Sequence, residues 1–134
     1  AALLGTMTDV QTNEILPEYK NIRIYPDDVR EFLRTGNMKF KQIWVLHPDP
    51  WPKAKHEKRR LLQTEFINLL ASHLTDDGEI IIGTDHWGYY DWILAQVAQT
   101  DLNTTVPDIS TIETRYQHKN MAETDGPKYL VITR

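Results

Sequence analysis

A single acid stands between two prolines, directly before a dense run of cations. The sequence reads His47-Pro-Asp-Pro-Trp-Pro-Lys53, and five of the fifteen Lys and Arg residues fall within the eight residues from Lys53 to Arg60. Proline fixes its own backbone φ angle and restricts the residue before it, so the Asp49 carboxylate is positioned at low entropic cost. Because lysine and arginine bind phosphate oxygens, the pattern predicts a site that grips a polyanion, nucleic acid first, and acts on part of it.

Three acids, Asp28, Asp49 and Asp85, each follow a segment that we expect to be a strand. In open parallel sheets, ligands bind at the carboxyl ends of the strands, so the three carboxylates could line a shared cleft. The alternative for each acid is a helix cap. Trp51 likewise has two interpretations, a stacking platform for a base or a core side chain.

The run of cations indicates a functional role, because the stability of the fold does not explain it. They span the turn and the first turn of the helix expected next, where positive charge opposes the helix dipole. The alternative is a solvated helix face. The five histidines lack the paired spacing of a zinc site, so no metal is expected. No glycine-rich phosphate or nucleotide loop occurs in the sequence. The cations are Lys53, Lys55, Lys58, Arg59 and Arg60.

Short β-rich runs alternate with longer helical ones along the chain. This alternation predicts an α/β layered fold with a mostly parallel sheet and an antiparallel strand pair at its C-terminal end. The 3.6-residue spacing of apolar residues predicts that the helix over 58–74 buries one face. The expected strands are 21–25, 41–46, 79–83, 111–117 and 128–133, the expected helices are 26–35, 58–74 and 86–98, and a turn is expected at 75–78.

The composition is that of one globular domain. The chain has 134 residues, 40% of them hydrophobic, and a formal net charge of −4, which argues against a generally basic nucleic-acid coat. The absence of cysteine fits a reducing compartment, and we expect a cytoplasmic protein. No apolar run approaches the roughly 20 residues of a membrane span, so no membrane partner is expected.

The Pro48-Asp-Pro-Trp-Pro-Lys53 segment followed by Lys55-His-Glu-Lys-Arg-Arg60 resembles the signature of the bacterial tRNA (guanine-N7-)-methyltransferases. Three further segments resemble that family in the same order: Asp28-Val-Arg-Glu31, Gly83-Thr-Asp85 and Thr114-Arg-Tyr-Gln117. The resemblance implies a Rossmann-like class I methyltransferase sheet with helices on both faces. It also implies S-adenosyl-L-methionine as cofactor, tRNA as partner, and 7-methylguanosine in the tRNA variable loop as product. A monomer or a homodimer is expected.

The resemblance assigns roles position by position. Asp28 and Asp49 would face the methyl donor, with Asp49 also the catalytic residue. The target nucleoside would contact Lys53, Asp85, Thr114, Arg115, Tyr116 and Gln117. The tRNA backbone would be bound by Lys55, His56, Lys58, Arg59 and Arg60.

The chain departs from the family pattern in three places. The family's glycine-rich loop and the acid that ends its second strand have no counterpart in residues 1–134. We therefore expect the chain to be the C-terminal portion of a single methyltransferase domain, without its first two strands and inactive by itself. Gln117 replaces a glutamate of the family, which removes a charge, and His47 stands where an aromatic or small residue is usual.

Two other functions stay open. The first is a non-catalytic RNA-binding remnant that keeps the basic run but cannot hold the donor. The second is a methyltransferase of the same fold that acts on another nucleobase. An enzyme for an exocyclic amine would carry Asn or Asp followed by Pro-Pro and an aromatic residue, whereas Pro50 is followed here by Trp51 and then Pro52.

Overall fold

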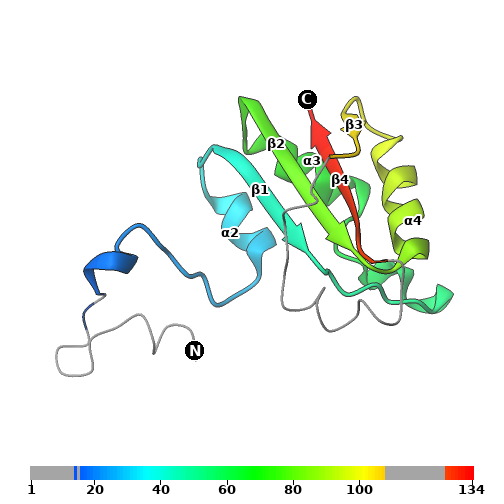
Figure 1. The fold of residues 1–134 in the computed structure, drawn as a ribbon, viewed down its shortest axis with the longest axis horizontal. Helices are drawn as coiled ribbons and strands as arrows, with labels where there is room; N and C mark the ends of the chain where they lie inside the picture. The colour runs from blue at the N-terminus through cyan, green and yellow to red at the C-terminus, as the bar shows by residue number, and fades with distance from the viewer. Residues whose placement is uncertain (1–13, 15, 108–125) are drawn as a thin grey trace. The chain divides into compact units, whose positions relative to one another are not determined.

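The computed structural model describes residue 14, residues 16–107 and residues 126–134. The chain divides into two compact units, Ala1–Gly36 and Asn37–Arg134, and each is described by itself. Figure 1 shows the elements along the chain. That the chain forms a single domain stays a prediction.

The described part of the first unit contains a 3-10 helix, η1 (Pro17–Tyr19), and one α-helix, α2 (Val29–Thr35). The predicted strand over 21–25 is wrong, because these residues are exposed and form no strand. A strand needs a partner for its backbone groups, and the described residues of this unit offer none. The Tyr25 side chain instead lies against Phe32, with ring centroids 4.8 Å apart.

The second unit is built on a four-stranded sheet of order β1-β2-β4-β3. β1 (Phe40–Leu46) runs parallel to β2 (Leu74–Thr84), and β4 (Lys128–Thr133) is antiparallel to both β2 and β3 (Asn103–Thr105). The antiparallel orientation of 128–133 is thus confirmed, while the predicted strand over 111–117 lies outside the described residues. β3 is not among the strands expected from the sequence, because its three polar residues carry no strand pattern. The described sheet is therefore mixed rather than mostly parallel.

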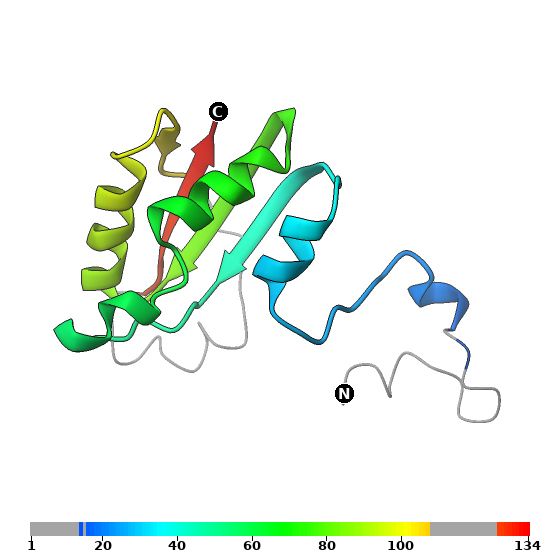
Figure 2. The same ribbon diagram turned by 180° about the vertical axis from the view of Figure 1, so that it is seen from behind.

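The core lies between this sheet and two helices, α3 (Thr64–Ser72) and α4 (Trp87–Val97). Antiparallel pairing places Ile80 opposite Ile132 and Ile82 opposite Leu130, and all four are almost fully buried. The two helices are joined by the Gln96 side chain, whose Oε1 accepts from the backbone N–H of Thr64 at 3.0 Å. In Figure 2, which shows the molecule from behind, α3 lies in front of the sheet. The expected helix layer on the other face stays a prediction.

The predicted helix over 58–74 is two shorter elements. A 3-10 helix, η2 (Ala54–Arg59), is followed by a break, and α3 begins only at Thr64. The side-chain amide of Gln63 donates to the carbonyls of Glu57 and Arg60, which satisfies backbone groups at the break. The apolar spacing correctly predicted burial, since Leu62, Phe66 and Leu70 are at most 6% exposed, but it did not predict the break.

The predicted turn at 75–78 lies inside β2. Phe40 pairs with Leu74 and Gln42 pairs with Glu79, so β2 carries extra residues opposite Lys41. Glycine at position 78 lets the backbone of β2 approach β1 closely at this irregularity, because a Cβ atom there would lie 2.9 Å from the carbonyl oxygen of Phe40. The next helix agrees well with its prediction: α4 starts after His86, whose Nδ1 accepts from the backbone N–H of Tyr89 at 2.9 Å.

Candidate active site

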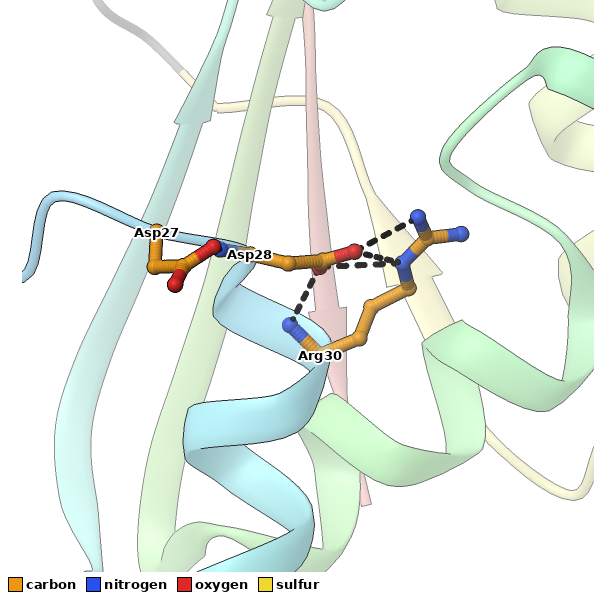
Figure 3. Close-up of polar contacts among 3 residues, drawn as sticks. All are labelled: Asp27, Asp28 and Arg30. Atoms are coloured by element: carbon orange, nitrogen blue, oxygen red, sulfur yellow. Dashed lines mark hydrogen bonds and ion pairs between the residues drawn. The ribbon is translucent and has the colours of Figure 1, made fainter.

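Asp28 is the N-cap of α2 in the first unit, and its carboxylate is hydrogen-bonded to Arg30. It accepts from the backbone N–H of Arg30 at 2.9 Å and from the Arg30 guanidinium at 2.8–3.2 Å (Figure 3). These hydrogen bonds lower the pKa of Asp28 to about 2. The cap that the sequence left as the alternative interpretation is therefore present, and a donor contact by Asp28 stays a prediction.

Asp49 and Asp85 leave the sheet at the same edge of the second unit. Leu46 at the end of β1 pairs with Gly83 of β2, and the backbone N–H of His47 donates to the carbonyl of Gly83 at 2.8 Å. The two aspartates follow this last bond by two residues each. The predicted common edge is thus present for these two acids.

The turn that carries Asp49 is bounded by two unusual backbone conformations. His47 has φ 50° and Trp51 has φ 42°, in the left-handed region that bulky residues rarely adopt. Such conformations persist only where the surrounding structure holds them. Between them, Asp49 is exposed, and its carboxylate has neither a hydrogen bond nor an ion pair with the residues that the structure describes. The turn is constrained while its acid stays accessible.

His47, at this edge, is partly buried. Burial lowers the pKa of His47, and the charge of Asp85 acts in the opposite direction, which indicates that the two side chains are close. The sequence flagged His47 only as a departure from the family pattern, and its proximity to Asp85 depends on the pairing of β1 with β2.

Most of the basic run lies on η2 and is accessible. Lys53, Lys55, Lys58 and Arg59 are exposed and form no ion pair with an acid in the described part of the chain. These cations precede α3, so the argument that they oppose its dipole is wrong: η2 is a separate 3-10 helix.

The Trp51 ring contacts two side chains of η2, Arg59 and His56. The Arg59 guanidinium lies 5.0 Å from the centroid of the Trp51 ring, and the His56 ring meets it edge-on at 5.7 Å. The half-buried Trp51 therefore packs on η2 and is neither a fully buried core residue nor a free platform.

Arg60 differs from the other cations. It is 6% exposed, its Nε donates to the carbonyl of Pro50 at 2.8 Å, and its guanidinium lies over the rings of Tyr89 and Trp92. Burial raises the pKa of Tyr89, which the charge of Arg60 counteracts and that of Asp49 reinforces. The sequence missed this cluster, although the apolar pair that follows Arg60 was a signal that the chain enters the core there.

The structure adds a hollow that no motif indicated. It has a volume of about 410 Å³ and is lined by Tyr90, Val106, Pro107, Pro127, Lys128 and Tyr129. Lys128 pairs with Thr84, so the hollow begins one residue from Asp85. The Lys128 ammonium lies 4.4 Å from the centroid of the exposed Trp87 ring. Aromatic and cationic side chains thus gather on one side of Asp85.

The remaining predictions concern four nucleoside-contacting residues, metal binding and the membrane. Thr114, Arg115, Tyr116 and Gln117 lie outside them. Within residues 14, 16–107 and 126–134, no three His, Asp or Glu side chains gather in a way that could hold a metal ion. In the same ranges, no helix has the length and apolar character that crossing a membrane requires.

Comparison with known proteins identifies relatives. The chain is 43% identical over 89 residues to a tRNA (guanine-N(7)-)-methyltransferase of Wolbachia pipientis, covering 66% of this chain and 40% of the relative. It is 34% identical over 124 residues to the protein of that name from Rhodospirillum rubrum, covering 85% and 49%, and 35% identical over 120 residues to that of Novosphingobium aromaticivorans, covering 77% and 48%. The chain spans about half the length of the curated relatives it matches or less.

A protein-family model gives the broader assignment. The model described as "Putative methyltransferase" matches residues 3–128, which is nearly the whole chain. The α/β arrangement of the second unit, with parallel β1 and β2 and an antiparallel β4, agrees with a Rossmann-like methyltransferase sheet. The chain therefore belongs to this methyltransferase family.

Proposed function

We propose that the protein methylates guanine N7 in tRNA, at the variable-loop guanosine, with S-adenosyl-L-methionine as methyl donor. The observation that carries the proposal is the Asp49 turn. Its backbone is constrained, its carboxylate is exposed, and neither this carboxylate nor the cations Lys53, Lys55, Lys58 and Arg59 form an ion pair with any residue that the structure describes. The names of the relatives support the same activity. A cytoplasmic location and a monomeric or homodimeric state belong to this proposal.

The chemistry needs few reactive groups. Guanine N7 carries an in-plane lone pair on the major-groove edge of the base, so no proton has to leave before attack. The enzyme mainly has to align N7, the methyl carbon and the departing sulfur, and alignment is what a constrained turn supplies. We assign the Asp49 or Asp85 carboxylate to the N1 and N2 donors of the guanine, where an anion favours the positive charge on the methylated ring.

The described residues fit the methyl donor unequally. When bound, S-adenosyl-L-methionine supplies an electrophilic methyl group on a sulfonium. Asp49 fits an ammonium or hydroxyl of the donor, because its carboxylate has no partner among the described residues. Asp28 fits less readily, since Arg30 already supplies three donor groups to its two oxygens. Asp49 is therefore the stronger candidate of the two.

The accessible cations suit the ribose-phosphate backbone. We assign Lys53 and Asp85 to the target nucleoside, and Lys55, His56, Lys58 and Arg59 to tRNA phosphates. Because Arg59 also lies on Trp51, a phosphate bound there would be linked to the Asp49 turn through one side chain. Thr114, Arg115, Tyr116 and Gln117 complete the nucleoside contacts in this proposal.

The test uses the whole protein as its gene encodes it, with unmodified tRNA and isotopically labelled donor. We expect label in the tRNA and strand scission at a variable-loop guanosine after borohydride and aniline treatment, which reports methylation at N7. Transfer of label to another position would favour the rival with another nucleobase. Salt-dependent tRNA binding without transfer would favour the RNA-binding remnant and overturn the proposal.

A further inference from the structure

Arg60 is a cation inside the protein, whereas its neighbours in the basic run face solvent. Only 6% of Arg60 is accessible to solvent, whereas Lys58 and Arg59 are exposed. A charge that leaves water needs partners that replace its hydration, so the contacts of a buried cation indicate what it does. A phosphate would find little of this guanidinium accessible.

The Arg60 guanidinium joins three parts of the second unit. Its Nε donates to the carbonyl of Pro50 in the Asp49 turn at 2.8 Å. Its Cζ lies 5.3 Å from the ring centroid of Tyr89 and 5.0 Å from that of Trp92, both on α4. Its Nη1 is 4.0 Å from the Glu57 carboxylate on η2. A planar guanidinium can stack on rings and donate along its edge at once, which a lysine ammonium cannot.

The α4 side of this cluster is itself fixed. Tyr89 is fully buried, and its hydroxyl accepts from the backbone N–H of Leu62 at 3.2 Å. The α4 helix is further joined to the start of α3 through Gln96 and Thr64. Arg60 therefore connects the turn to a part of the fold that has little freedom to move.

The turn needs such a connection. Trp51, the residue after Pro50, has φ 42°, and His47 on the other side has φ 50°. These conformations are unfavourable for residues with a side chain and are kept only by surrounding contacts. The carbonyl of Pro50 is one peptide unit from the Cα of Asp49, so a hydrogen bond that fixes this carbonyl also limits the orientation of the Asp49 carboxylate.

We infer that Arg60 is a positioning residue for Asp49 and not a tRNA contact. This rests on the proposed function, because the effect is read through methyl transfer. The inference withdraws Arg60 from the five residues that the resemblance assigned to the tRNA backbone. The assignment of Lys55, His56, Lys58 and Arg59 is unchanged.

The test is Arg60→Lys in the whole protein, a change that keeps the charge and removes the Nε donor and the planar stack. We expect the single-turnover rate constant of methyl transfer to fall on the order of 10- to 100-fold. We expect the dissociation constant for tRNA and its salt dependence to change by less than about twofold. With enzyme in saturating excess over tRNA, the single-turnover rate constant does not depend on the fraction of folded enzyme, so a loss of folded protein alone would leave it unchanged.

Two other variants calibrate the result. Arg34→Lys makes the same chemical change at an exposed arginine of the first unit, in the last turn of α2, and is expected to alter neither rate nor binding. Arg59→Ala is expected to weaken tRNA binding. If Arg60→Lys weakens tRNA binding as much as Arg59→Ala and leaves the rate constant unchanged, Arg60 is a nucleic-acid contact and the inference is overturned.

Hydrogen exchange gives a readout without activity. In Arg60→Lys, the amide of His47, which donates to the carbonyl of Gly83 at the start of the turn, is expected to exchange faster, while the amides of β2 keep their protection. Unchanged exchange at His47 would overturn the inference even if the wild-type protein transferred no methyl group, which would separately overturn the proposed function. Should Arg60→Lys not fold, Trp92→Leu removes one ring contact and keeps the guanidinium. A rate constant within twofold of wild type in that variant would count against the inference.

Discussion

Asp28 and Asp49 are each associated with an arginine, but the arginine acts on different atoms. Arg30 binds the carboxylate of Asp28 itself, through its guanidinium and its backbone N–H, and lowers the pKa of that acid to about 2. Arg60 donates to the backbone carbonyl of Pro50, the residue after Asp49, and the Asp49 carboxylate has no partner among the described residues. In the first arrangement the carboxylate is paired and caps a helix, whereas in the second the arginine binds the backbone of the turn and the carboxylate stays exposed.

The same difference extends to the surrounding charges. Near Asp28, the cations Arg30 and Arg34 both act on the acid and lower its pKa. Near Asp49, no described cation of η2 pairs with that acid, and Glu57 lies near the buried Arg60. Opposite charges that already satisfy each other attract a further ion weakly, whereas unpaired cations attract phosphate. Among the described residues, the accessible charges therefore lie at the Asp49 turn and η2 rather than at Asp28.

The largest expected effect is the removal of charge at Asp49. In the whole protein, Asp49→Asn is expected to lower the rate constant of methyl transfer on the order of 100-fold, because an amide cannot stabilise positive charge on the methylated guanine. Single-turnover kinetics with unmodified tRNA measures this. Asp28→Asn is the matched variant, and because asparagine also caps helices, we expect at most about a tenfold increase in the KM for the donor. Equal losses in the two variants would erase the distinction between the two acids.

The next effect concerns tRNA binding. The double variant Lys58→Ala, Arg59→Ala is expected to reduce the slope of log affinity against log salt by about 1.5, because each phosphate contact contributes about 0.7–0.9. The control is Arg30→Gln, whose cation is already paired with Asp28 and should leave the slope unchanged. Binding titrations at several salt concentrations measure both slopes. A larger change in the control would mean that the first unit, rather than η2, contacts the nucleic acid.

The smallest effect is on the ionisation of Asp28. Arg30 holds the pKa of Asp28 at about 2, against an ordinary value of 3.8, mainly through side-chain and backbone hydrogen bonds. Because the folded-state pKa is lowered, the contribution to stability is present above about pH 4 and is lost as the pH falls through about 2. In Arg30→Gln, carbon-detected NMR titration should show the pKa of Asp28 rise toward its ordinary value. An unchanged pKa would show that the Arg30 side chain does not hold the carboxylate in solution.

The sequence predicted the elements that local patterns define. The strand over 41–46, the helix over 86–98 and the strand over 128–133 are present within a residue or two, because their apolar runs and caps are contained in the segments themselves. The strand over 21–25 failed for the converse reason: its pattern was β-like, but a strand forms only with a partner. The helix over 58–74 failed because its apolar period continues across the break at Arg60 and Gln63.

The sequence by itself determined the chemical groups of the site and the rigidity of one turn. Asp49 lies between two prolines in any fold, and the cations from Lys53 to Arg59 follow it at fixed spacing. Asp28 with Arg30 two residues later is also a local arrangement, since a side chain reaches that far without tertiary structure.

Only the tertiary structure decided which cation is buried and which acids share an edge. Arg60 meets Pro50 ten residues before it and Tyr89 and Trp92 about thirty residues after it, and Asp49 approaches Asp85 through the pairing of β1 with β2. Whether a cation leaves water depends on partners that are distant in sequence, and no local pattern of charge or hydropathy contains them.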